Sequence, residues 1–277
     1  GFVSAGNVAK NFEDALGREL GLINPVSVNS GTSALHLGLV VANIKPGDEV
    51  ILPAQTFIAT GLAVLMQGAV PVFADIQHDT GNIDPESIRT KITERTKLII
   101  AVHWGGYPCD MDEINTIANE FNLLVMEDAA HALGALYKDR PIGSISNFTA
   151  FSFQAIKHLT TGDGGALCCK ENIDYFEAKK KRWFGIDREN SKPSELGERL
   201  FDIDEVGYKY HLNDVSAAIG LGNLKNFSSQ LSRIQQIAKI YRDELEKVEG
   251  LQLLDYKEDR RSAYWLFTVL VENRGDF

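Results

Sequence analysis

The chain has 277 residues, 44% of them hydrophobic and 24% charged, which is enough to bury a large core and to form more than one domain. Its formal net charge of −10 and its pI near 5.1 argue against nucleic acid or an anionic membrane surface as a partner. No apolar run is long enough to cross a bilayer, and no signal peptide is recognisable.

Strands and helices are expected to alternate through the first half of the chain. Helical spacing and short apolar runs predict helices over Asn7–Leu20, Ser33–Ala42, Thr56–Met66, Ser87–Ile92 and Met111–Phe121, and strands over Pro25–Val28, Glu49–Leu52, Pro71–Ala74, Leu98–Val102 and Leu123–Glu127. Several of these runs are apolar throughout, which is typical of parallel strands covered on both faces. The alternation therefore predicts an α/β fold with a parallel sheet flanked by helices.

The rhythm changes after Leu167. A helix over Asp174–Trp183 and a polar loop lead to a long charged helix over Ser216–Val248. Strands of a second sheet are expected at Leu251–Asp255 and Ala263–Val271. We place a domain boundary inside the long helix, with a large domain over residues 1–232 and the start of a smaller one over 233–277. Since the chain lacks an initiator Met and stops after one apolar run, we expect it to be cut at both ends.

The three cysteines form neither a CxxC pair nor a metal-ligand pattern; they are Cys109, Cys168 and Cys169. Reduced thiols in the cytoplasm are the simplest interpretation, because disulfides are rare in that compartment. No metal site is expected.

A lysine turn joins two apolar stretches in the middle of the chain. The run Phe148–Phe153 is followed by Lys157, two threonines and a glycine-rich bend, and a second apolar stretch begins at Ala166. A lysine held there between buried strands would be partly desolvated, which disfavours its charged form. A neutral amine is a nucleophile for a carbonyl cofactor, but an ordinary surface lysine in a hairpin turn is an equally good interpretation of this stretch alone.

Ligands of open parallel sheets bind beyond the carboxyl ends of the strands, and three stretches are expected there. In the first, Gly31, Thr32 and Ser33 would offer N–H groups, hydroxyls and a helix N-terminus to a phosphate. Taken alone, the stretch is better explained by an ordinary helix cap. In the second, Asp128 ends an apolar strand and needs a cation, which a protonated pyridine nitrogen would supply; a helix cap or a metal ligand is the alternative. In the third, Phe57 could stack on a flat ring, although most phenylalanines at such places are simply core.

A phosphate cradle, a carboxylate, a stacking aromatic and a lysine turn are together the parts needed to hold pyridoxal 5′-phosphate. At this point the chain resembles the DegT/DnrJ/EryC1/StrS sugar aminotransferases, a family of fold-type I pyridoxal phosphate enzymes. The motifs that carry the resemblance follow the family's order and cover almost the whole chain: NSGTSALHL, PGDEVILPAQTFIAT, NIDP, EDAAHALGA, FSFQAIKHLTTGDGG and GYKYHLNDVSAAIGLGNL. The resemblance implies a mostly parallel sheet flanked by helices, with part of a smaller α+β C-terminal domain.

The resemblance also implies roles for single residues. Lys157 matches the Schiff-base lysine and Asp128 the partner of the pyridine nitrogen, while His131 lies where the family has Gln or His near the ring hydroxyl. Ser152 resembles the phosphate-binding serine, beside Gly31, Thr32 and Ser33, and Phe57 matches the stacking aromatic. Lys209 is at the position of a residue that reaches the neighbouring subunit's phosphate, which implies a homodimer with shared active sites.

The implied activity is transfer of an amino group, from glutamate, to a nucleotide-linked ketosugar during polysaccharide biosynthesis. Relatives with histidine in place of the lysine are dehydratases, so the presence of Lys157 favours amino transfer. C4 of a 4-keto-6-deoxyhexose, as in perosamine synthases, is the expected site. An amino-acid aminotransferase or desulfurase on the same fold and a non-catalytic binding or regulatory member are the alternatives.

Overall fold

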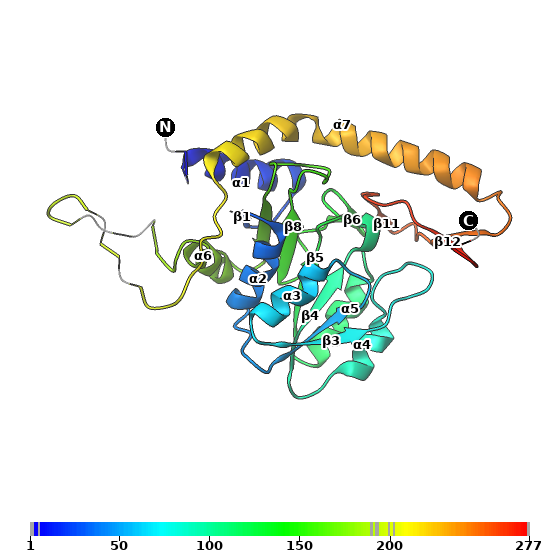
Figure 1. The fold of residues 1–277 in the computed structure, drawn as a ribbon, viewed down its shortest axis with the longest axis horizontal. Coiled ribbons are helices and arrows are strands. Elements are labelled where there is room, and N and C mark those ends of the chain that lie inside the picture. Colours follow the sequence, from blue (N-terminus) through cyan, green and yellow to red (C-terminus); the bar gives the residue numbers. More distant parts are fainter. Residues whose placement is uncertain are drawn as a thin grey trace.

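The computed structural model describes residues 3, 4, 6–188, 191, 194–198, 200, 201 and 203–275. Its centre is a seven-stranded sheet (Figure 1), whose strands in spatial order are β1 Pro25–Val28, β9 Gly165–Cys169, β8 Phe148–Ser152, β5 Leu124–Asp128, β4 Thr96–Val102, β2 Glu49–Pro53 and β3 Val70–Ala74. Of these strands, β9 runs antiparallel to both of its neighbours, and the others are mutually parallel. The predicted α/β fold with a mostly parallel sheet is confirmed.

Helices cover both faces of the sheet (Figure 1), and the described ones are α1 Asn7–Leu20, α2 Gly31–Val41, α3 Ile58–Met66, α4 Pro85–Lys91, α5 Met111–Glu120, α6 Asn172–Lys181 and α7 Asp214–Leu245. Alternate residues of β4 belong to two different buried clusters, since Leu98 and Ile100 pack on one face and Ile99 and Ala101 on the other. Successive side chains of a strand point to opposite faces, and both faces of β4 are buried. The sequence of β4 is therefore an almost unbroken apolar run.

Short strands lie outside the main sheet: β6 Leu136–Tyr137, β7 Arg140–Pro141, β10 Leu251–Leu253, β11 Arg260–Arg261 and β12 Val269–Val271. The predicted second sheet exists as the antiparallel pair of β10 and β12. The helix α7 runs along one side of the molecule from α1 toward these strands (Figure 1) and spans residues 232 and 233 without a break. The domain boundary placed there stays a prediction.

The predicted strand over Ala263–Val271 is wrong in its first half. Residues 262–266, which we call the docking segment, form no strand, and Tyr264 has a φ of +52°. The backbone N–H groups of Ala263 and Leu266 donate to Gly106 O at 2.9 Å and Gly105 O at 3.2 Å. Tertiary contacts therefore override a local apolar pattern that favours a strand. Within the described ranges, no helix combines the length and apolar character needed to span a membrane.

Candidate active site

A cavity of about 510 Å³ lies where the parallel strands end, and it brings together most of the predicted site residues. Its lining includes Gly31, Thr32, Phe57, Asp128, His131, Ser152 and Lys157. The lining does not include Ser33 and Lys209. The N–H and the hydroxyl of Ser33 are engaged by Ser30 and Asn29, at 3.0 and 2.6 Å. The helix-cap interpretation therefore holds for the Ser30–Ser33 pair.

The lysine turn connects β8 to β9. Its base is closed by two backbone hydrogen bonds, from Phe153 N to Gly164 O at 2.8 Å and from Thr161 N to Phe153 O at 2.9 Å. Burial lowers the pKa of the Lys157 ammonium, while the nearby Asp128 carboxylate acts in the opposite direction. A lowered pKa leaves more of the amine neutral near pH 7, as a nucleophile requires.

Asp128 ends β5, and its side chain is 6% exposed. Its Oδ2 accepts a hydrogen bond from the Thr60 hydroxyl at 2.7 Å, and its Oδ1 accepts one from Ala130 N at 3.2 Å. Burial raises the pKa of this carboxyl, and these two hydrogen bonds oppose the rise. Among the described residues, no cluster of His, Cys, Asp and Glu could hold a metal ion. A cationic ring nitrogen in the cavity would stabilise the ionised form.

His131 is 8% exposed, and its Nδ1 has no hydrogen-bond partner among the described residues. Burial, followed by the positive charges of Lys157 and His158, lowers the pKa of this histidine to about 3. It is therefore neutral at any working pH. A buried neutral ring with an unused nitrogen can bind a ligand hydroxyl without adding charge to the cavity.

Part of the cavity wall is formed by the N-terminus of α2, beside the end of β8. A Cβ added at Gly31 would lie 2.9 Å from Ser152 Cβ, so glycine is what lets β8 and the helix approach so closely. The N–H groups of Gly31 and Thr32 are in the first turn, where a helix has no internal acceptors. This corner can bind a phosphate, with Ser152 Oγ beside it.

The sequence interpretation missed three contributors to this cavity. Thr60 holds Asp128, and Trp104 and Trp265 line the wall beside His131. The Trp265 ring stacks on His131 at a centroid distance of 3.9 Å. Thr60 lies within the PAQTFIAT motif and could have been found there, whereas nothing local marks Trp265.

Phe57 and Lys209 lie at the periphery. Phe57 lines the mouth of the cavity but is 70% exposed, so its stacking role stays a prediction. Lys209 is exposed between Tyr208 and Tyr210, which both pack edge-on against His36. Because side chains alternate along an extended segment, the Lys209 side chain points away from the body of this subunit.

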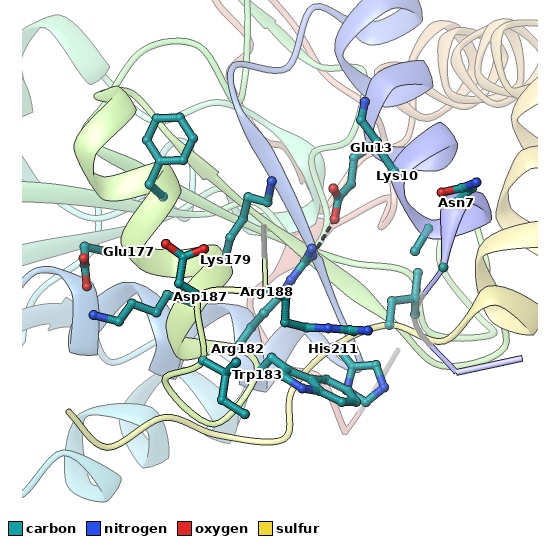
Figure 2. A pocket seen from close by; sticks show the side chains of 16 residues that line it. Asn7, Lys10, Glu13, Glu177, Lys179, Arg182, Trp183, Asp187, Arg188 and His211 are labelled. Carbon is teal, nitrogen blue, oxygen red and sulfur yellow. Dashed lines mark hydrogen bonds and ion pairs between the residues drawn. The ribbon is translucent and has the colours of Figure 1, made fainter. Parts of the chain in front are cut away.

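A second cavity, of about 420 Å³, lies between α1, α6 and residues 211–212 (Figure 2). Arg182 crosses it to bind Glu13 at 2.5 Å and Ser27 O at 2.7 Å. The Trp183 ring lies beside His211, with centroids 3.9 Å apart. Burial and the charge of Arg182 lower the pKa of His211 to about 4. None of the predicted catalytic residues lines this cavity.

The residues of the first cavity fit pyridoxal 5′-phosphate. The α2 N-terminus and Ser152 would hold its phosphate, Asp128 its ring nitrogen and His131 its ring hydroxyl, while Lys157 supplies the amine for covalent attachment. The fit rests on the unused Nδ1 of His131, the buried carboxyl and the close approach at Gly31.

Known proteins match almost the whole chain. An uncharacterized protein of Methanocaldococcus jannaschii is 44% identical over 98% of this chain and 70% of its own length. A GDP-perosamine synthase of Escherichia coli O157:H7 is 34% identical over 96% of this chain and 70% of its own. The crystal structure of AtS13 from Actinomadura melliaura matches with a TM-score of 0.93 and 38% identity, covering 100% of this chain and 75% of that one.

The family model for DegT/DnrJ/EryC1/StrS aminotransferases matches residues 1–276. Enzymes of this family are sugar aminotransferases that use pyridoxal 5′-phosphate, and solved relatives share their fold-type I architecture with this chain. From a match that spans nearly the whole sequence, and from a cavity that presents the lysine and carboxylate such an enzyme needs, it follows that the chain belongs to the DegT/DnrJ/EryC1/StrS aminotransferase family.

Proposed function

We propose that this enzyme transfers an amino group from glutamate to C4 of a nucleotide-linked 4-keto-6-deoxyhexose. The observation that carries the proposal is the convergence of Lys157, Asp128 and His131 on one cavity, with the pKa of Lys157 lowered by burial. The similarity to GDP-perosamine synthases supports the choice of sugar. So does the apolar part of the lining, which suits the methyl group of a 6-deoxy sugar; it includes Leu35, Val102, Trp104 and Ile156.

When bound, pyridoxal 5′-phosphate supplies an electron sink for the electron pair released at the substrate carbon. Lys157 Nζ would take the proton from the α-carbon of the amino donor as general base and would deliver it, as general acid, to C4′ of the cofactor. Asp128 would keep the proton on the ring nitrogen, and the α2 N-terminus would hold the phosphate. Because the amino donor and the sugar use the same Lys157 in turn, the kinetics should be ping-pong.

The alternative functions have less support. A desulfurase needs a reactive cysteine, but Cys109, Cys168 and Cys169 are all buried, and burial raises the pKa of each thiol. A non-catalytic role leaves the buried Asp128 carboxyl and the desolvated Lys157 without a reason. These free thiols also support our proposal that the enzyme works in the cytoplasm.

The function can be tested with a panel of nucleotide-linked ketosugars and 2-oxo acids, each assayed with glutamate. We expect amination of the 4-keto-6-deoxyhexose, release of 2-oxoglutarate, and a product whose new amine is assigned to C4 by NMR. Amination at C3 would correct the carbon that we propose and leave the rest of the proposed function unchanged. Efficient transfer to simple 2-oxo acids, with no reaction of any ketosugar, would replace our proposal by an amino-acid aminotransferase.

We further propose a homodimer in which Lys209 reaches the cofactor phosphate bound by the partner subunit. The proposal is supported by the outward direction of the Lys209 side chain. The rings of Tyr208 and Tyr210 stack on each other, and the Tyr210 hydroxyl bonds His36, which fixes the backbone on both sides of Lys209. Loss of one charge-assisted contact should weaken cofactor binding about 10- to 150-fold, which a Lys209→Ala variant would show in a titration. A lysine acts toward the phosphate as a point charge, so Lys209→Arg should retain most of the affinity.

The sharing itself is tested by co-expressing the Lys157→Ala and Lys209→Ala variants. A heterodimer then has one site with both lysines, Lys157 from one chain and Lys209 from the other. We expect activity above that of either parent when cofactor is limiting. Heterodimers as poor as the parents would mean that each site is built within one chain.

A further inference from the structure

Trp265 lies between His131 and the amine of Lys157. The His131 ring stacks on the indole with a centroid distance of 3.9 Å and an interplanar angle of 12°. Lys157 Nζ is 3.8 Å from the centroid of the same ring, a distance at which a cation lies over a face rather than at an edge. Since one face is covered by the imidazole, the amine is over the other.

The indole is held by the lysine turn as well as by its own segment. Trp265 Nε1–H donates to Ile156 O at 3.2 Å, and the neighbouring His158 Nε2 bonds Ala263 O at 2.9 Å. The docking segment is thus tied to the residues on both sides of Lys157. On its other side, a Cβ added at Gly106 would lie 3.2 Å from Trp265 N and 2.7 Å from His131 O, so the backbone there is packed without space to spare.

The backbone just before Trp265 is in an unusual conformation. Tyr264 has a φ of +52°, and bulky side chains rarely occupy this left-handed region. Such a conformation persists only where the surroundings impose it, and it is enriched at functional sites. Here it turns the chain so that Trp265 points into the space beside Lys157, which places its ring in the linings of both the 510 Å³ cavity and the open cleft against α7.

We propose that Trp265 is a positioning residue for the cofactor lysine, holding the Lys157 ammonium over one indole face and separating it from His131 on the other. The proposal rests on Lys157 being the reacting amine of the proposed function. An aromatic face attracts a cation and has no such attraction for the neutral amine. Trp265 therefore opposes the burial that lowers the pKa of Lys157, and it releases the amine once the proton is lost.

Other charged and titratable groups also face Lys157. Asp128 favours the ammonium from β5, whereas His131 and His158, where protonated, would disfavour it. Asp163 lines the same cavity, and Arg233 on α7 lines the cleft. A test must leave all five groups in place and change only the ring of residue 265.

The test compares Trp265→Phe with Trp265→Leu. Both variants lose the indole N–H and keep an apolar side chain, but only phenylalanine keeps an aromatic face. The protein is freed of cofactor by dialysis against an amino donor, which displaces the cofactor from Lys157. The rate at which added pyridoxal 5′-phosphate then forms its visible chromophore on Lys157 is followed across pH. The midpoint of that profile reports the loss of the amine proton. We expect it to lie about half a pH unit lower in the leucine variant than in the phenylalanine variant.

Trp183→Leu is the matched control, because Trp183 also has a cation over its ring, Arg188 at 4.9 Å, but lines the second cavity (Figure 2). Its midpoint should equal that of the unaltered protein. If the leucine variant at 265 fails to fold, site-specific incorporation of mono- and difluorotryptophan at position 265, which leaves Trp104 and Trp183 unaltered, weakens the ring's attraction with little change of its shape. The midpoint should then fall stepwise with each fluorine.

Equal midpoints for leucine and phenylalanine, or no trend with fluorination, would show that Trp265 only fills space. That result would leave Lys157 as the reacting amine and the proposed function intact. A chromophore that maps to another lysine, by contrast, would remove both proposals.

Discussion

Lys157→Ala should give a colourless protein with no aminotransferase activity, a loss of more than about 10⁴-fold. The amine at this position is both the attachment point of the cofactor and the group that moves the substrate proton, so no neighbour can replace it. Borohydride reduction of the unaltered, yellow protein should fix the chromophore to the peptide that contains Lys157, as mass spectrometry would show.

Lys225→Ala is a suitable control, since Lys225 is exposed on α7 and outside both cavities. That variant should keep the colour and the rate. Reduction that labels a different lysine, or an alanine variant that still turns over, would remove Lys157 from its assigned role.

Asp128→Asn should keep the fold and bind the cofactor but lose about 10²- to 10⁴-fold in rate. The amide is the same size; its oxygen can still accept from Ala130 N, and its NH2 group can donate to the Thr60 hydroxyl oxygen, so the local packing survives. What disappears is the negative charge that holds the ring-nitrogen proton, and this charge matters most when electrons accumulate on the ring. The loss should therefore appear in kcat more than in the affinity for the cofactor.

Asp174→Asn provides the comparison. Burial raises the pKa of Asp174 as it does that of Asp128, but Asp174 belongs to the first turn of α6 and not to the cavity. Its removal should leave kcat unchanged. If the Asp128→Asn protein kept the full rate, the role of Asp128 would be only structural, as the acceptor of the hydrogen bond from Ala130 N.

The parts of the site that lie at strand ends could be predicted from sequence. Asp128 closes an apolar run, Lys157 follows another, and Gly31 follows a third, so each is placed by a signal within a few residues. Parallel strands then bring their carboxyl ends to one edge of the sheet. The apolar runs are local in the sequence, and the meeting of strand ends follows from the topology of the sheet. Neither depends on how side chains pack.

Choices made by packing could not be predicted in this way. Ser33 is expected among the phosphate ligands, but its hydroxyl donates to Asn29 and it does not line the cavity, whereas Ser30 does. The docking segment has an apolar pattern that favours a strand, and its backbone instead bonds to Gly105 and Gly106. Both outcomes depend on partners that the local sequence does not indicate.

The long reach of the docking segment also sets the order in which the site is assembled. Trp265 and Ile156 are joined by a hydrogen bond across 109 residues, and His158 and Ala263 by one across 105. On a ribosome, the sheet and its lysine turn can form while that segment is still unsynthesised, since chains fold from the N-terminus as they emerge. The nascent protein thus passes through an interval in which Lys157 is in place and its indole wall has not yet been made.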